Sequence, residues 1–187
     1  ELEAPEPSLV TSIRTGFKKL SPAYFAWVAS MMDPLPEDEL RELTAATAPY
    51  VEAMKKMDPS LDPDYFRILK VGGLRMGIGS ALDKKYLMQI RGSTDDPLDD
   101  VVLELKHVRD LAGIPCIHTE PFDPFRVLLG QARISYTPFR MLGYVRMHGE
   151  NFWVHAWVYN YQELELNLFQ TPQQLIEVAY DVGVHLG

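Results

Sequence analysis

The short stretch GIGS at residues 77–80 constrains the fold more than any other feature, because of the segments that flank it. Residues 65–76 before it are β-like in composition, and residues 86–91 after it form a short strand candidate. An acidic turn at 92–100 follows, and residues 101–108 then alternate between apolar and polar side chains. The glycine stretch is therefore expected to join two strands, with a third strand next in the chain.

The position of a glycine turn separates the main classes of nucleotide-binding loop. In Rossmann and P-loop sites the turn opens a helix, whose N-terminus holds the phosphates. In protein kinases it joins two antiparallel strands, and a lysine follows on the next strand. Glycines let backbone N–H groups approach phosphate oxygens, while the lysine supplies a fixed positive charge. The order seen here favours the kinase arrangement, although a G-x-G pair alone can also mark a simple tight turn.

Lys106 lies on that next strand. The alternation in VVLELKHV, residues 101–108, places Glu104 and Lys106 on one face, and Leu103 and Leu105 on the other. Two interpretations stay open for the lysine. It is either a phosphate-binding residue or a solvated strand lysine that pairs with Glu104.

The rest of the chain predicts an α+β protein with an antiparallel sheet of about five strands. Helices are expected at residues 8–19, 23–32, 36–57 with a kink or split at Pro49, 124–134, and from Thr171 onward. Strands at 140–147 and 152–159 flank the turn HGEN and predict a hairpin. The turn-rich residues 58–64 separate an N-terminal helical region, 1–62, from an α+β domain, 63–187.

Composition limits the function classes. The 187 residues are 47% hydrophobic and 24% charged, which is typical of a globular domain. The formal net charge of −8 disfavours nucleic-acid binding, and no apolar run approaches the roughly 20 residues of a membrane helix. The single cysteine, Cys116, excludes an internal disulfide framework and fits a reducing compartment. We therefore expect a cytoplasmic protein that binds neither nucleic acid nor membranes, while homo-oligomer formation stays open.

The ends of the chain indicate a piece of a longer protein. The first residue is Glu1 rather than an initiator methionine, and the last helical pattern still runs at Gly187. We expect further functional motifs to lie outside these residues.

Several motifs in this order resemble a known family. The run GLRMGIGSALDKKYLMQIRG followed by VVLELKHVRD resembles the bacterial domain-of-unknown-function family numbered 2252, whose members carry a G-x-G-S-x-G, R-Y, L-x-x-K-E-A pattern. FRVLLGQARIS, residues 125–135, resembles the family's R-V-V-x-G-Q helix, and FWVHAWV, residues 152–158, is similar to its F-Y-V-R-x-L strand. The resemblance covers roughly residues 64–187.

That family is placed with the protein-kinase-like folds, so the resemblance implies the small lobe of such a protein. It implies that Gly77, Gly79 and Ser80 cover the phosphates, that Lys106 pairs with them, and that ATP and Mg²⁺ are the cofactors. The family's catalytic loop, resembling G-D-x-H-x-x-N, and its metal-binding D-F-D have no counterpart in this chain. We therefore expect the remainder of the parent chain to be the partner, and the fragment alone to be inactive.

The chain also departs from the family pattern. Leu82 stands in place of the third glycine, and His107 and His155 replace a Glu and an Arg. Glu104 occupies the position where kinases put a small residue against adenine, and a carboxylate there should hinder a purine. Gln131 is the nearest substitute for the helix glutamate that holds the lysine in kinases. Two functions therefore stay open: a nucleotide-binding lobe of a phosphotransferase, and a noncatalytic interaction or scaffold domain.

Overall fold

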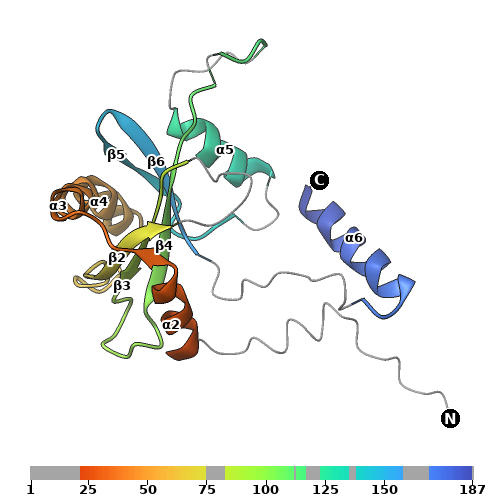
Figure 1. Cartoon of the computed structure of the whole chain (residues 1–187), viewed down its shortest axis with the longest axis horizontal. Helices are drawn as coiled ribbons and strands as arrows, with labels where there is room; N and C mark the ends of the chain where they lie inside the picture. Colours follow the sequence, from red (N-terminus) through yellow and green to blue (C-terminus); the bar gives the residue numbers. More distant parts are fainter. Residues whose placement is uncertain are drawn as a thin grey trace.

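A single open sheet organises the molecule (Figure 1). The computed structural model describes residues 22–74, 83–111, 113–116, 123–134, 138–157 and 169–186. The strands are β1 (Met32–Asp33), β2 (Ile68–Leu74), β3 (Lys85–Ile90), β4 (Val101–His107), β5 (Gly143–Met147) and β6 (Glu150–Ala156). The helices are α2 (Pro22–Ser30), α3 (Glu37–Ala46), α4 (Ala48–Met57), α5 (Pro124–Ile134) and α6 (Pro172–Leu186).

The sheet order is β1-β2-β3-β4-β6-β5, and every neighbouring pair is antiparallel. The predicted α+β class with an antiparallel sheet is confirmed. The expected number of about five strands was too low, because the six-stranded sheet includes the two-residue strand β1 at its edge. β1 lies close to β2 at Gly72, where a Cβ atom would come within 2.7 Å of the Met32 Cβ. The glycine therefore permits this close pairing.

The predicted helices agree with the structure where it describes them. The helix expected at 23–32 is α2, and it begins at Pro22 in the first-turn position that proline favours. The long helix expected at 36–57 is split into α3 and α4 at Thr47, with Pro49 in the first turn of the second helix. The helix expected at 8–19 lies outside the described residues.

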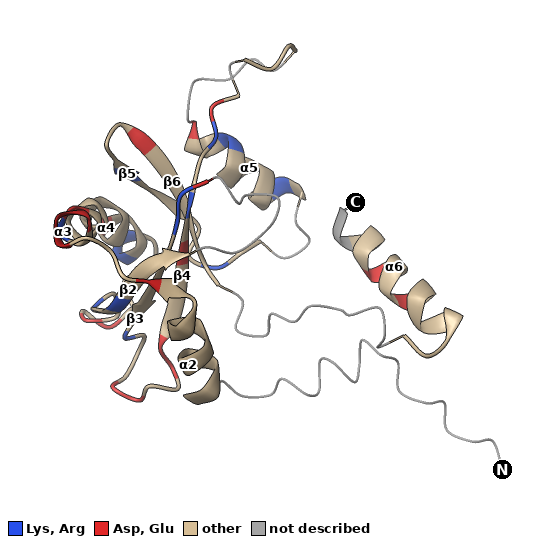
Figure 2. Ribbon diagram, viewed as in Figure 1, with Lys and Arg blue, Asp and Glu red and all other residues tan. Residues whose placement is uncertain are grey.

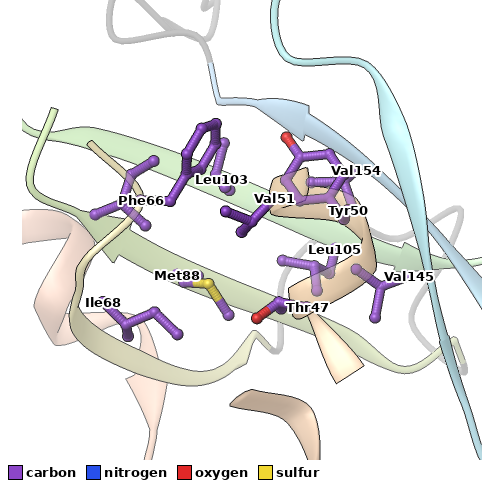
Figure 3. A pocket seen from close by; sticks show the side chains of 11 residues that line it. Thr47, Tyr50, Val51, Phe66, Ile68, Met88, Leu103, Leu105, Val145 and Val154 are labelled. Atoms are coloured by element: carbon purple, nitrogen blue, oxygen red, sulfur yellow. The ribbon is translucent and has the colours of Figure 1, made fainter. Parts of the chain in front are cut away.

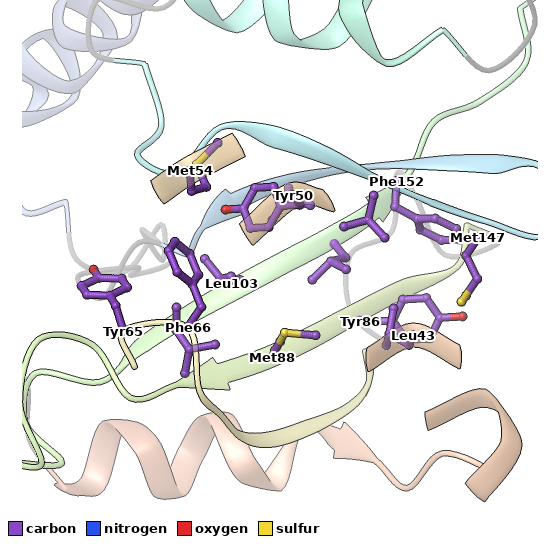
Figure 4. Close-up of a cluster of buried hydrophobic side chains, with 14 residues drawn as sticks. Leu43, Tyr50, Met54, Tyr65, Phe66, Tyr86, Met88, Leu103, Met147 and Phe152 are labelled. Atoms are coloured by element: carbon purple, nitrogen blue, oxygen red, sulfur yellow. The ribbon is translucent and has the colours of Figure 1, made fainter. Parts of the chain in front are cut away.

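The main hydrophobic core lies on the face of the sheet that α3 and α4 cover, here termed the first face (Figure 4). Leu43, Tyr50 and Met54 from these helices pack against strand residues such as Leu103 and Phe152. The Tyr50 ring fits over Gly143, since a Cβ there would lie 2.7 Å from the ring. The Tyr50 hydroxyl donates a hydrogen bond of 2.8 Å to the Met141 carbonyl.

The opposite, second face carries a smaller apolar cluster beneath α2. Its buried members are Phe25, Val28, Leu74, Leu87 and Val102. α5 packs against β6 at another part of this face, where Phe125 contacts Tyr144, the strand partner of Trp153. The described residues before position 63, from Pro22 on, thus contribute β1 and the helices α2, α3 and α4 to the packing of the sheet.

Two local motifs formed as the sequence predicts. The hairpin between β5 and β6 turns at His148 and Gly149, with φ of 54° and 79°, which is the positive-φ pair of a type I′ turn. At α6, the Gln174 Oε1 accepts from the backbone N–H of Thr171 at 3.2 Å, and the Thr171 hydroxyl accepts from the Gln174 N–H at 3.4 Å. This reciprocal pair is a capping box.

Charge is distributed unevenly over the helices (Figure 2). The first turn of α3 is acidic, α6 carries Glu177 and Asp181, and α5 carries Arg126 and Arg133. Among the helices in the described part of the chain, none is both long and apolar enough to cross a membrane.

Candidate functional site

Four ionisable side chains meet on the second face of the sheet. The β3–β4 register places Lys85 opposite Lys106, and the β4–β6 register places Glu104 opposite His155. The predicted alternation in β4 is confirmed, since Leu103 and Leu105 belong to the core of the first face. Lys85, Glu104, Lys106 and His155 are here termed the polar cluster.

The strongest contact in the polar cluster joins Glu104 to His155. The Glu104 Oε2 lies 3.0 Å from the His155 Nε2, and both side chains are almost buried, with 12% and 4% of their surfaces exposed. The His155 Nδ1 lies 3.0 Å from the Ala156 carbonyl oxygen. Carbonyl and carboxylate oxygens both only accept, so each of these two contacts is a hydrogen bond only where the ring nitrogen that faces the oxygen carries a hydrogen.

The His155 ring contacts two aromatic side chains. Its centroid lies 4.3 Å from the Phe139 ring and 4.5 Å from the Trp153 ring, with interplanar angles of 35° and 22°. These contacts fix the ring in the orientation that faces Glu104. Glu104 is therefore bound to a rigid partner.

The electrostatics of Glu104 follow from this setting. Burial on its own raises the pKa of the carboxyl group. The hydrogen bond and charge of His155, followed by the charges of Lys106 and Lys85, oppose that effect and lower the pKa below its usual value of 4.5. The carboxylate is thus kept ionised.

Lys106 has a different environment from the one expected. The predicted alternative that Glu104 pairs with Lys106 is not what the structure shows, because the ion pair of Glu104 is with His155. The Lys106 Nζ lies 6.0 Å from the centroid of the Trp153 ring, within the range of a cation–π contact. Lys106 influences Glu104 through its charge.

Lys85 is the member of the cluster that sequence reasoning missed. Only 4% of the surface of Lys85 is exposed. Burial is the main reason that its pKa is lowered, and the neighbouring charge of Lys106 adds to the effect. Two lysines directly across a strand pair repel each other, and the charges of the Glu104 and Asp83 carboxylates oppose this effect at Lys85. The strand was expected to begin at Tyr86, and only the register with β4 reveals the position of Lys85.

Polar contacts hold the ends of β3 and β4 together. The Arg109 Nε donates to both Asp83 carboxylate oxygens, at 2.8 and 2.9 Å. An Arg126 Nη donates to the Arg109 carbonyl oxygen at 2.9 Å, which links α5 to the same corner. The approach to β3 is therefore fixed next to the residue pair Lys85 and Lys106.

The structure places the other predicted site residues as follows. Gly77, Gly79 and Ser80 lie outside the described residues, as does Leu82. Gln131 lies on α5 and is half-buried, and its proposed contact with Lys106 stays a prediction.

His107 belongs to the first face of the sheet rather than to the polar cluster. Its ring contacts Phe152, and its Nε2 lies 3.6 Å from a Glu150 oxygen.

His155, in contrast, is a member of the polar cluster. Its signal in the sequence was that it replaces an arginine in the pattern of the family that the sequence resembles.

Two hollows among the described residues lie away from this cluster. One is a gap of about 10 Å³ inside the core of the first face (Figure 3), which is the size of a single water. It is lined almost entirely by apolar side chains, and the Thr47 hydroxyl there already donates to the Thr44 carbonyl at 2.7 Å. A second hollow of about 330 Å³ is lined by Met54, Met57, Asp58, Leu61, Met141 and Leu142. Neither offers the cations that a phosphate needs.

Metal ligands and relatives give no further guidance. Within the described residues, no group of three or more His, Cys, Asp or Glu side chains could hold a metal ion.

No family model matches the chain, and no curated protein or solved structure is significantly similar to it. The resemblance to family 2252 therefore rests on the motifs quoted above.

Proposed function

We propose that the chain is the nucleotide-binding small lobe of a kinase-like protein, in which Lys106 binds the phosphates of ATP. The observation that carries the proposal is the place of Lys106 in the sheet. β2 ends at Leu74 and β3 begins at Lys85, directly opposite Lys106. The connection that contains the GIGS stretch therefore leaves and re-enters the sheet at the end where Lys106 lies.

The order of the elements supports the same proposal. A strand, a glycine-bearing connection and a second strand are followed by a strand with a lysine, then by α5 and the β5–β6 hairpin. In protein kinases a glycine-rich loop covers the phosphates, the lysine lies on the third strand, and a helix supplies its partner. β1 and the helices α3 and α4 are additions to that plan.

The Glu104–His155 pair also supports it. A carboxylate paired with Lys106 would neutralise the charge that a phosphate needs. Glu104 has its short contact, of 3.0 Å, with His155 rather than with Lys106, so Lys106 is not held in a direct salt bridge to this carboxylate. The alternative that Glu104 pairs with Lys106, which the sequence left open, is therefore disfavoured.

The proposal covers nucleotide binding and not catalysis by this chain. Phosphoryl transfer requires metal-binding carboxylates and a residue that orients the nucleophile. The described residues do not assemble such a ligand set for Mg²⁺, so no catalytic step is assigned to them. The reaction itself is proposed to need sequence beyond this chain.

Calorimetric titration tests the proposal. We expect ATP to bind weakly, in the millimolar to submillimolar range, since half of a two-lobed site lacks its second wall. Lys106→Met keeps most of the side-chain volume but should abolish the binding. Lys56→Met is the matched control, because Lys56 is exposed on α4 and lies away from the second face. Equal binding by all three proteins would remove Lys106 from the site.

A noncatalytic interaction domain is the second candidate function. It is favoured by exposed apolar side chains on α6, which lies apart from the sheet in Figure 1: Leu175, Ile176, Tyr180, Val182 and Val184. Exposed apolar surface of this kind often marks an interaction site. Failure of the titration at millimolar ATP, with Lys106 intact, would favour this candidate.

A further inference from the structure

α2 lies on the second face of the sheet, beside the polar cluster. Its two buried side chains are Phe25 and Val28, which pack with Leu74, Leu87 and Val102. These three partners come from β2, β3 and β4, the strands that frame the lysine end of the site. α2 is therefore a cover over the apolar part of the same surface.

The strand register relates two residues beneath α2, Leu87 and Val102, to the position of Lys106. Leu87 of β3 is the direct partner of Glu104 of β4. Glu104 lies two residues from Lys106, on the same face of β4. Val102 lies four residues from Lys106, which corresponds to about 13 Å along a strand. An extended nucleoside triphosphate spans this distance between its phosphates and its base. With phosphates at Lys106, a base directed along β4 arrives at Leu87 and Val102.

We propose that α2 is an autoinhibitory helix, which occupies the place of the nucleotide base and must leave the sheet before the base binds. The inference rests on the proposed function and adds its regulation. Aromatic stacking fits this role, because Trp27 of α2 stacks on Trp157, with centroids 5.8 Å apart and an interplanar angle of 28°. A base that displaces α2 would replace one planar contact with another.

The length and packing of α2 suit a helix that can leave the sheet. The helix has nine residues, and isolated helices of this length are unstable in water. Trp27 remains 40% exposed in spite of its stacking. The cluster beneath α2 is also distinct from the main core on the first face. α2 can therefore detach while the sheet and its main core stay folded.

Two ligands separate the phosphate site from the base site. Inorganic tripolyphosphate carries the phosphates alone, and ATP carries the base as well. The variant Trp27→Ala removes the stacking contact, and Ala26→Ser on an exposed position of α2 is its control. If α2 is closed nine-tenths of the time, its release raises the affinity for ATP about 10-fold. The affinity for tripolyphosphate should change by less than about twofold.

A second measurement does not depend on any variant. Hydrogen–deuterium exchange of the wild-type chain should rise in residues 22–30 when ATP is added. Tripolyphosphate should leave the exchange of these residues unchanged. This comparison remains informative if Trp27→Ala fails to fold.

The outcomes distinguish the inference from the function on which it rests. Tripolyphosphate binding with no effect of Trp27→Ala on ATP affinity, and no change in exchange at α2, overturns the autoinhibitory role alone. Failure of tripolyphosphate to bind at all overturns both the phosphate site and the inference. A selective gain for ATP with increased exchange at α2 upholds both.

Discussion

Glu104 and His155 face each other across β4 and β6, with the carboxylate Oε2 3.0 Å from the imidazole Nε2. The sequence singled out both residues, Glu104 at a position where kinases have a small residue and His155 in place of an arginine of the pattern it resembles, and the sheet brings the two together. The imidazole provides the carboxylate with a partner, so Glu104 need not neutralise the neighbouring lysine. The site is a lysine pair beside a buried carboxylate–imidazole pair, and the charges of both lysines also act on Glu104.

A double-mutant cycle measures this pair. Glu104→Leu leaves His155 buried without its carboxylate and should lower the free energy of unfolding by about 3 kcal/mol. Adding His155→Phe, which suits the aromatic surroundings formed by Phe139 and Trp153, should recover much of that loss. Urea denaturation then gives a coupling energy of at least about 1 kcal/mol.

The chain contains a matched control for that cycle. His107 and Glu150 are also cross-strand neighbours, but their atoms are 3.6 Å apart and both side chains are more exposed. Their coupling should be below about 1 kcal/mol. Equal coupling energies for the two pairs would contradict the special role assigned to Glu104 and His155.

The pKa of Glu104 predicts a dependence of stability on pH. Because the folded-state pKa is lower than in the unfolded chain, the ionised carboxylate stabilises the fold above the unfolded value of 4.5. The contribution is lost as pH falls through the lower folded pKa. The difference in urea midpoint between the wild type and Glu104→Gln should therefore be constant near neutral pH and shrink in acid. A difference that grows in acid would contradict the direction of this pKa shift.

Gly72 tests the docking of β1 on the sheet. In Gly72→Ala the new methyl group would lie 2.7 Å from the Met32 Cβ and 2.8 Å from the Asp33 carbonyl oxygen. We expect a loss of about 1–3 kcal/mol, as for other overpacked sites. Gly73→Ala is the control, because its nearest contact is an ordinary 3.6 Å to Leu35. Thermal denaturation that fails to separate the two variants would argue against close β1–β2 packing.

Local signals accounted for the parts of the fold that were predicted. Proline positions mark the start of α2, and the break at Thr47 lies two residues before Pro49. At α5 the Phe125 N–H bonds the Asp123 carboxylate at 2.9 Å, as expected for a helix start at Asp123-Pro124. Each of these features depends on residues close together in the chain.

The missed features depend on contacts between distant residues. β1 has only two residues, and its pairing depends on a glycine forty residues later, so no periodic pattern could reveal it. In the site, alternation placed Glu104 and Lys106 on one face, but the partner of Glu104 comes from β6. That adjacency is set by the sheet order, in which β4 lies beside β6 rather than β5.

The central claim is that Lys106 contacts a phosphate, and NMR of the lysine side chains tests it most directly. The chain is labelled with ¹³C at lysine Cε and titrated with tripolyphosphate, and Lys106→Met assigns the Lys106 signal. The account predicts a saturable shift of the Lys106 signal together with that of Lys85, which lies opposite it. The signals of Lys55 and Lys56 on α4 should stay in place. An unchanged Lys106 signal, with shifts confined to exposed lysines, would contradict the account.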